Sequence, residues 1–244
     1  MLNTRKSTIP KKPRFNMVRN RAYTLLLHLD IRQFPVDPFC VVDHFPNIKV
    51  LKYTECISDE FPDPLYFDKR NKRIDEINLT ASDSEDRLPH IDAQVCSQRG
   101  ADEYHIIYDD RISNVQRIRW TIAHELGHIF CRHLVHFEGT ALCRGGLTKE
   151  EYGILEIEAH LFASDLLAPR AVLCQFKFEA PNEISLLCDI SKSAGEKKFK
   201  QLKNQERNYG SLDLFKNFYA HLKSGDYQKV IYENLCGYAH APFF

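Results

Sequence analysis

The spacing of apolar residues predicts that the chain begins with a short helix. Ala22, Leu25 and the neighbouring leucines recur at helical intervals, which predicts a helix over residues 18–28. Pro35 and Pro38 follow closely. Two prolines so near each other exclude a continuing helix, so the chain must turn there.

Three later segments have the pattern of strands. Alternating apolar and polar residues predict a strand over 48–53. The β-prone runs 91–97 and 104–108 are separated by a segment with Gly100, which predicts a hairpin or a pair of neighbouring strands. Residues 59–89 are polar, charged and interrupted by proline, so we expect irregular structure or short strands there.

Two longer helices follow the strands. Ser113 offers an N-cap and Gln116 the other half of a capping box, so a helix should run from there to about His133. A second helix is predicted over about 150–167, closed by Pro169. The fold class is therefore α+β, with a small twisted sheet beside two long helices.

The last part of the chain has a different character, that of a small helical extension. Two short helices are predicted within 183–205, and the aromatic-rich stretch 212–244 should be helical in its first half. The apolar positions expected in the core of the first pair are Ile184, Leu187, Ile190, Ala194, Phe199 and Leu202. The lysines expected outside are Lys192, Lys197, Lys198, Lys200 and Lys203. A helical extension packed on the main domain is favoured, and a helix-turn-helix-like element is the alternative.

Charge argues against the whole molecule being an electrostatic nucleic-acid binder. Lys+Arg and Asp+Glu both number 33, so the formal net charge is zero. Residues 1–17 are nevertheless basic, with no acid before Asp30. We expect a solvated, flexible leader there, with contact to nucleic acid or to an acidic partner as the alternative.

The sequence also bears on location. No apolar run has the length of a signal peptide or of a membrane span, so we expect no membrane association. The eight cysteines include no C-x-x-C pair, which favours reduced, mostly buried thiols over a disulfide framework. A cytoplasmic protein is the expectation.

The segment His124-Glu125-Leu126-Gly127-His128 carries the chemistry. Histidines four residues apart lie on one face of a helix, one turn apart, where both imidazoles can bind one ion. Glu125 lies about 100° round the helix from His124, so it is poorly placed as a third ligand. It can still reach a water bound to that ion and act as a general base.

The surroundings of this segment indicate a largely buried helix. Trp120, Ile122, Leu126 and Ile129 flank the histidines, and unpaired imidazoles would be costly there unless something satisfies them. Gly127 weakens a helix by about 1 kcal/mol relative to alanine. The simplest reason for it is the close approach of another backbone.

A catalytic zinc site needs a third protein ligand, and the second helix offers two glutamates. Glu156 shares a face with Ala159 and Ala163, whose small side chains allow close packing against the first helix, whereas Glu158 falls on a different face. We therefore favour Glu156 as the ligand. His160, one turn after Glu156, is either a hydrogen-bond partner that orients a ligand or a partly exposed helix histidine.

Other residues near the segment receive weaker expectations. His133 and His136 lie just beyond it, and packing or solvent-exposed roles are favoured over assistance to an oxyanion. Cys131 could face the site, but an inert buried thiol is favoured. Arg117 and Arg119 are expected on the helix surface or in salt bridges.

Together these segments resemble the ImmA/IrrE family of metallopeptidases. The family pattern R-x-x-x-A-H-E-x-G-H is similar to the run that ends at His128, and E-x-x-A-N-x-F-A-x-x-L-L-x-P is similar to the run from Glu156 to Pro169. The likeness covers about 18–170 and extends weakly to about 205. The family usually has Asn at the position of His160 and commonly Met at that of Ala168.

The resemblance implies a role for each matching position. His124, His128 and Glu156 would be the ligands of one zinc ion per chain, or of another divalent metal, and Glu125 the general base. It also implies a gluzincin-like arrangement of two ligand-bearing helices beside a small twisted sheet. Family members cleave helix-turn-helix repressors or are paired with antitoxin-like regulators, so the implied partner is a protein substrate, with direct DNA binding not favoured.

We therefore expect three regions: a basic leader at 1–17, a metallopeptidase domain at 18–175, and a helical extension at 176–244. An extended substrate is expected to pair with the strand at 104–108, taken as an edge strand. The competing hypotheses are a DNA- or protein-binding regulator with a structural metal site, and a zinc hydrolase that acts on a small molecule.

Overall fold

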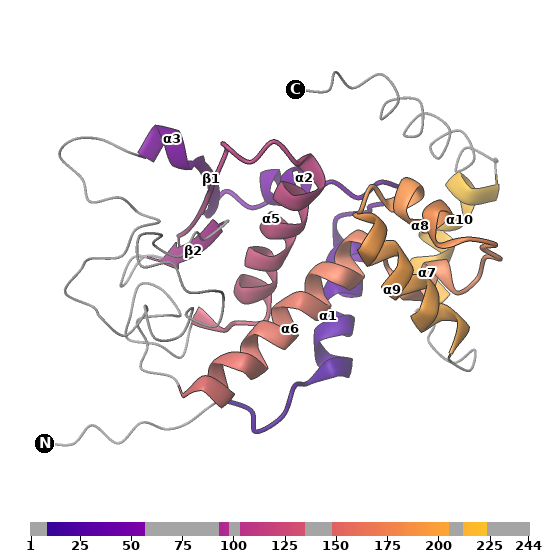
Figure 1. Cartoon of the computed structure of the whole chain (residues 1–244), viewed down its shortest axis with the longest axis horizontal. Coiled ribbons are helices and arrows are strands. Elements are labelled where there is room, and N and C mark those ends of the chain that lie inside the picture. Colours follow the sequence, from indigo (N-terminus) through magenta and orange to yellow (C-terminus); the bar gives the residue numbers. More distant parts are fainter. Residues whose placement is uncertain (1–8, 57–92, 98–102, 135–147, 205–211, 224–244) are drawn as a thin grey trace, which may run out of the picture.

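The computed structural model describes residues 9–56, 93–97, 103–134, 148–204 and 212–223. Its fold is mixed α+β, mostly helical, with a small sheet, which confirms the predicted class. Figure 1 shows the sheet on one side of the molecule and the C-terminal helices on the other, with α5 and α6 between them. The expectations for 59–89 and for 224–244 lie outside the described residues.

The helices and strands follow one another in an order close to the predicted one. The first half contains α1 (Phe15–His28), α2 (Pro38–Asp43), β1 (Ile48–Lys52), α3 (Tyr53–Cys56), β2 (Ala93–Ser97) and β3 (Tyr104–Tyr108). The second half contains α5 (Val115–Phe130), α6 (Lys149–Leu167), α7 (Arg170–Leu173), α8 (Pro181–Cys188), α9 (Lys192–Lys203) and α10 (Leu212–Lys223).

The sheet has the order β1-β3-β2, with β1 parallel and β2 antiparallel to β3. Ile106 at the centre of β3 is opposite Val50 on one side and Val95 on the other. The prediction that 104–108 is an edge strand is therefore wrong, because both sides of β3 are already paired. Within the described residues β2 is paired on one side only, and it contacts α5.

The helix α5 begins one residue later than the capping box predicted. Asn114 is the N-cap, and its side chain accepts a hydrogen bond from the Arg117 N–H. Ser113 is thus not the cap; Gln116 donates instead to Asp189 of the C-terminal region at 3.1 Å. The helix ends at Phe130, three residues before the predicted His133.

The two long helices pack closely against each other. Thr148 and Glu151 form a capping box at the start of α6, which fixes where this helix begins. A Cβ atom on Gly127 of α5 would lie 2.9 Å from Ala159 Cα. The expectation that this glycine permits the approach of another backbone is therefore confirmed.

The N-terminal helix covers α6 from the other side. Val18, Ala22 and Leu26 of α1 are fully buried, and α1 packs along α6. The helix starts at Phe15, inside the span expected as a leader, so the expectation is wrong for residues 15–17. Residues 1–8 lie outside the described part of the chain.

Charged side chains join the C-terminal helices to the main body. Arg119 of α5 pairs with Asp189, the C-cap of α8, as its expected salt-bridge role allowed. Lys198 of α9 reaches Asp165 of α6 at 3.2 Å. This lysine is 3% exposed, so its predicted place outside the extension is wrong.

The last described helix closes the hydrophobic core. Leu214 and Phe218 of α10 are fully buried, and the Phe218 ring lies 4.9 Å from that of Phe34. The core is therefore continuous from α1 to α10. None of the described helices is long and apolar enough to cross a membrane.

Candidate metal centre

His124 and His128 project from the same face of α5, as their spacing predicted. Their Nε2 atoms lie 3.1 Å apart, and their ring centroids 4.8 Å apart. Both side chains are largely buried. The Nε2 lone pairs of both imidazoles can therefore point at the same metal ion.

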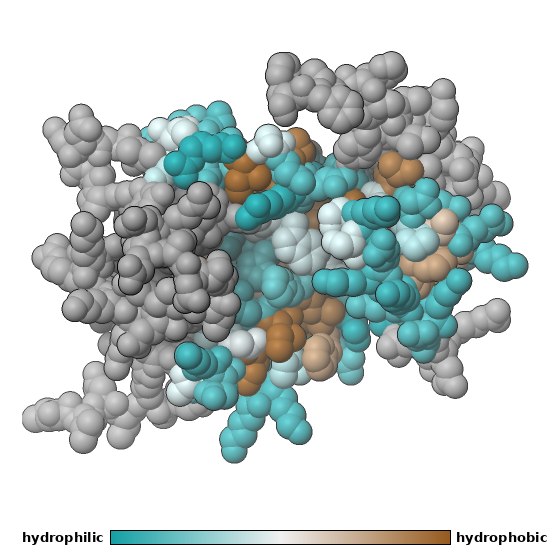
Figure 2. All heavy atoms as spheres, viewed as in Figure 1, coloured by the Kyte–Doolittle hydropathy of each residue, from teal (hydrophilic) through white to brown (hydrophobic). Residues whose placement is uncertain are grey.

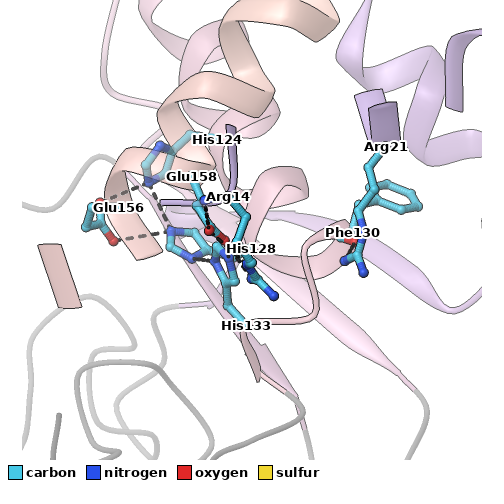
Figure 3. Close-up of polar contacts among 8 residues, drawn as sticks. All are labelled: Arg14, Arg21, His124, His128, Phe130, His133, Glu156 and Glu158. Carbon is cyan, nitrogen blue, oxygen red and sulfur yellow. Dashed lines mark hydrogen bonds and ion pairs between the residues drawn. The ribbon is translucent and has the colours of Figure 1, made fainter. Parts of the chain in front are cut away.

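Glu156 of α6 completes the cluster. Its Oε2 lies 3.2 Å from His124 Nε2, and its Oε1 lies 3.3 Å from His128 Nε2 (Figure 3). The three donor groups all lie within 4.8 Å of one another. The structure thus brings together the three residues that the helical faces selected.

Burial and mutual contact set the charges in this cluster. Burial lowers the pKa values of His124 and His128, which favours neutral imidazoles. Burial alone would raise the pKa of Glu156, but its close contacts with the two imidazoles hold that pKa well below its usual value. Neutral imidazoles and an ionised carboxylate are the forms that bind a metal.

Glu125 is buried next to this cluster and faces the sheet. Burial raises its pKa well above the usual value, and the charge of Glu156 raises it further. A hydrogen bond from the backbone of Val95 in β2 opposes both effects. Glu125 is thus a carboxylate with increased proton affinity beside the donor cluster, which suits a general base.

His160 contacts the cluster through its ring. Its centroid lies 4.7 Å from that of His124 and 6.0 Å from that of Trp120. The described residues show no hydrogen bond between His160 and a candidate ligand. His160 is exposed, which is closer to the expectation of a partly exposed helix histidine than to that of a hydrogen-bond partner. It also makes a ring contact with His124.

Glu158 points away from the cluster and has other partners. Its side chain is fully buried, and the fork of the Arg14 guanidinium donates to both carboxylate oxygens, at 2.9 and 2.7 Å. The Arg14 backbone N–H donates to the same group at 2.7 Å. The two glutamates lie on different faces of α6, as predicted. Glu156 therefore points toward α5, and Glu158 points toward the N-terminal segment.

His133 contacts both a candidate ligand and Glu158, which its position in the sequence does not indicate. It is 1% exposed, its Nδ1 lies 3.0 Å from His128 Nδ1, and its Nε2 lies 3.0 Å from Glu158 Oε2. The only signal in the sequence was its position just after the helix. Cys131 beside it is a buried thiol, as expected, and His136 lies outside the described residues.

The donor set fits a divalent ion such as zinc. Two imidazole nitrogens and one carboxylate are the protein ligands that catalytic zinc sites combine with an open position. In Figure 2, hydrophilic side chains line the recess in the middle of the view, over α5, and hydrophobic ones lie below it over α6. Within the described part of the chain, this is the one group of three or more metal-ligating side chains.

An HExxH helix with a carboxylate from a second helix beside it is typical of one class of protein, the metallopeptidases. Residues 77–199, half of the chain, match the M78 peptidase family model, described as the IrrE N-terminal-like domain. The chain therefore belongs to the ImmA/IrrE family of metallopeptidases, as its motifs indicated. A search of curated proteins finds no match.

Proposed function

We propose that this protein is a zinc-dependent endopeptidase in which His124, His128 and Glu156 hold the metal. One observation carries the proposal: two Nε2 atoms 3.1 Å apart, with the Glu156 carboxylate oxygens at 3.2 and 3.3 Å from them. Membership of a metallopeptidase family supports peptide-bond hydrolysis as the reaction.

Glu125 is the general base of this proposal. When bound, the metal supplies a Lewis acid for the scissile carbonyl and for the attacking water. Glu125 accepts the proton of that water at its carboxylate and donates it to the nitrogen of the leaving amine. Its buried position excludes bulk water, and its raised pKa makes the carboxylate a stronger base.

An extended substrate would pair with β2 rather than with β3. The Val95 backbone in β2 contacts Glu125, so the side of β2 away from β3 faces the candidate centre. Within the described residues this side of β2 has no strand next to it. A substrate that pairs with this edge of β2 through main-chain hydrogen bonds would have its scissile bond beside Glu125.

The substrate class follows from the family resemblance. We infer that the enzyme cleaves a regulatory protein, such as a helix-turn-helix repressor, in the cytoplasm, and so releases the genes under that repressor. Residues 18–175 would form the peptidase unit and the helices from 176 onward an extension of it. The burial of Lys198 against Asp165 removes one cation from the surface that a DNA-binding extension would need.

The decisive experiment separates metal binding from hydrolysis. Wild-type protein and Glu125→Gln, both loaded with zinc, are incubated with a complex peptide library and with any helix-turn-helix repressor found to be encoded beside the gene. Wild type should cleave within peptides, lose activity with a chelator and regain it with zinc. Glu125→Gln should bind zinc with similar affinity and cleave roughly a hundredfold more slowly or worse, which is the loss expected when a general base is removed.

Two results would contradict the proposal. One is cleavage by Glu125→Gln at the wild-type rate, and the other is full activity of metal-free protein. Cleavage of library peptides without cleavage of the repressor would support the endopeptidase assignment and contradict the inferred substrate.

A further inference from the structure

A tight turn directly after the C-terminus of α5 places His133 next to His128. Arg132 has a left-handed conformation, with φ of 60°. The Arg132 N–H donates to the Ile129 carbonyl and the His133 N–H donates to the His128 carbonyl, both at 2.9 Å. This pair of hydrogen bonds is a Schellman turn. The turn fixes the backbone of His133 against the last turn of α5, within reach of the His128 ring.

From this turn a chain of hydrogen bonds leads away from the candidate metal centre. His128 Nδ1 contacts His133 Nδ1, His133 Nε2 contacts Glu158, and Glu158 is bound by Arg14 (Figure 3). The members come from α5, the turn after it, α6 and the residue before α1. Three parts of the chain besides α5 therefore meet on the side of His128 away from the candidate metal centre.

The carboxylate at the end of this chain determines where each proton lies. Glu158 accepts three hydrogen bonds from Arg14, one from the backbone N–H and two from the fork of the guanidinium, so it is present as a carboxylate, which can only accept. His133 Nε2 must then be the donor to Glu158. In a neutral His133 ring, Nδ1 is left as an acceptor, and it accepts a hydrogen bond from the Nδ1–H of His128. His128 Nε2 is left with a lone pair that faces His124 and Glu156.

We propose that His133, Glu158 and Arg14 are positioning residues that hold His128 in its metal-binding tautomer and orientation. The inference rests on the proposed function, because it concerns the same metal centre. It adds three residues to that centre, and Arg14 lies outside the part of the chain that matches the family model. The N-terminal segment thereby becomes part of the machinery that binds the metal.

We call the hydrogen-bonded chain His128–His133–Glu158–Arg14 the relay. Of the two candidate histidine ligands, only His128 is held by it. His124 Nδ1 is buried and has no hydrogen-bond partner among the described residues, and its ring contact is with His160. His128 Nδ1 is held by His133 at 3.0 Å. Partners of this kind raise the basicity of a ligand and fix its ring, and their loss typically weakens metal binding about 10- to 100-fold.

The first test reads the tautomers directly. A long-range ¹H–¹⁵N correlation spectrum of zinc-loaded protein with ¹⁵N-labelled histidine shows which ring nitrogen of each residue carries a proton. The relay predicts a proton on Nδ1 of His128 and on Nε2 alone of His133. A proton on Nδ1 of His133, or on both of its nitrogens, would overturn the proposal without any substitution.

The second test measures zinc affinity by competition with a chelator. Glu158→Gln keeps the shape of the side chain but can donate to His133, which allows the opposite tautomers. This variant and His133→Phe should bind zinc about 10- to 100-fold more weakly. They should also alter the visible spectrum of the cobalt-substituted protein. A zinc affinity within twofold of wild type in both variants would overturn the relay.

Arg21 provides the matched control, because it also reaches from α1 to the end of α5. Its Nη1 donates to the Phe130 carbonyl at 2.6 Å, outside the relay. Arg21→Gln should lower the melting temperature yet leave zinc affinity and the cobalt spectrum unchanged. Equal losses of zinc affinity in Arg21→Gln and Glu158→Gln would show a structural effect and would contradict the relay.

The two proposals fail in different ways. Zinc-loaded wild-type protein that hydrolyses nothing would contradict the peptidase assignment, whereas the tautomers and zinc affinities of the variants would still decide the relay. Normal hydrolysis with unchanged zinc affinity in both relay variants would contradict only the relay.

Discussion

At Gly127 the two helices that carry the candidate ligands meet backbone to backbone. A Cβ atom there would lie 2.9 Å from Ala159 Cα and 3.0 Å from its carbonyl oxygen. These are backbone atoms, which cannot rotate away. The distance between α5 and α6, and with it the distance from His124 and His128 to Glu156, depends on the absence of one methyl group.

We therefore expect Gly127→Ala to destabilise the protein by about 1–3 kcal/mol, despite the better helix propensity of alanine. It should also weaken zinc binding, because α6 must move away from α5. Gly153 in α6 is the matched control, since a Cβ atom there meets nothing within 4 Å. Gly153→Ala should be neutral or stabilise by up to about 1 kcal/mol. Urea unfolding and chelator competition measure both effects, and a Gly127→Ala protein as stable as Gly153→Ala would contradict the packing argument.

The buried thiols give a second prediction for single residues. Burial raises the pKa values of Cys131 and Cys188 to about 12. Thiolate is the reactive form, so a raised pKa means roughly a thousandfold less of it at pH 8 than for a free cysteine. Iodoacetamide should label the exposed Cys40 before Cys131 and Cys188, and labelling of this buried pair should still be rising with pH at pH 10. Peptide mapping by mass spectrometry would contradict this if Cys131 reacted as fast as Cys40.

At the scale of elements, periodicity predicted the existence of α1, β1, β2, β3, α5 and α6. It did not predict how α5 ends. The usual signal for a helix stop is glycine in the left-handed position, and here Arg132 occupies it with φ of 60°. Without that signal the apolar pattern predicts a helix that continues to His133, with its imidazole on the helix rather than in the turn beside His128.

The turn after α5 can be tested by removing its strain. A left-handed conformation costs a residue with a side chain about 1–2 kcal/mol, so Arg132→Gly should stabilise the protein by about 1 kcal/mol. Arg132→Val should destabilise it, because a β-branched residue resists a positive φ. Denaturant unfolding gives both values. Loss of stability in Arg132→Gly would mean that the arginine side chain contributes more than its backbone conformation costs.

At the scale of the whole molecule, the boundary expected near residue 175 separates elements that share one core. Asp189 and Lys198 bind α5 and α6, and Phe218 packs on Phe34. The match to the family model also continues to residue 199. Whether the helices after 175 have a function of their own stays a prediction.

We expect that a chain ending at residue 175 does not fold stably. Removing α8 leaves the buried Arg119 without its carboxylate, and an uncompensated buried charge typically costs about 3–5 kcal/mol. A chain ending at residue 223 retains these contacts and should melt at a clearly higher temperature than the shorter chain. Circular dichroism during heating measures both. A cooperative transition of the shorter chain at the full-length temperature would show that the extension is an independent unit.

The candidate site shows what a sequence can and cannot specify. The faces of two helices were enough to select His124, His128 and Glu156, because helical geometry is local and periodic. Helical faces give no indication of Arg14, since its contact with Glu158 spans 144 positions and leaves no periodic trace. They identify His133 only as a residue beyond the helix and do not indicate its contact with His128. The edge strand was misassigned for a similar reason: alternation identifies a strand but not its neighbours.

The central claim, that three side chains from two helices hold one catalytic ion, is tested most directly by the zinc content of purified protein. Elemental analysis should give one zinc per chain for wild type and for Glu125→Gln, and much less than one for His128→Ala and Glu156→Ala at the same free zinc concentration. Wild-type protein that binds no divalent metal, or full zinc content in Glu156→Ala, would contradict it.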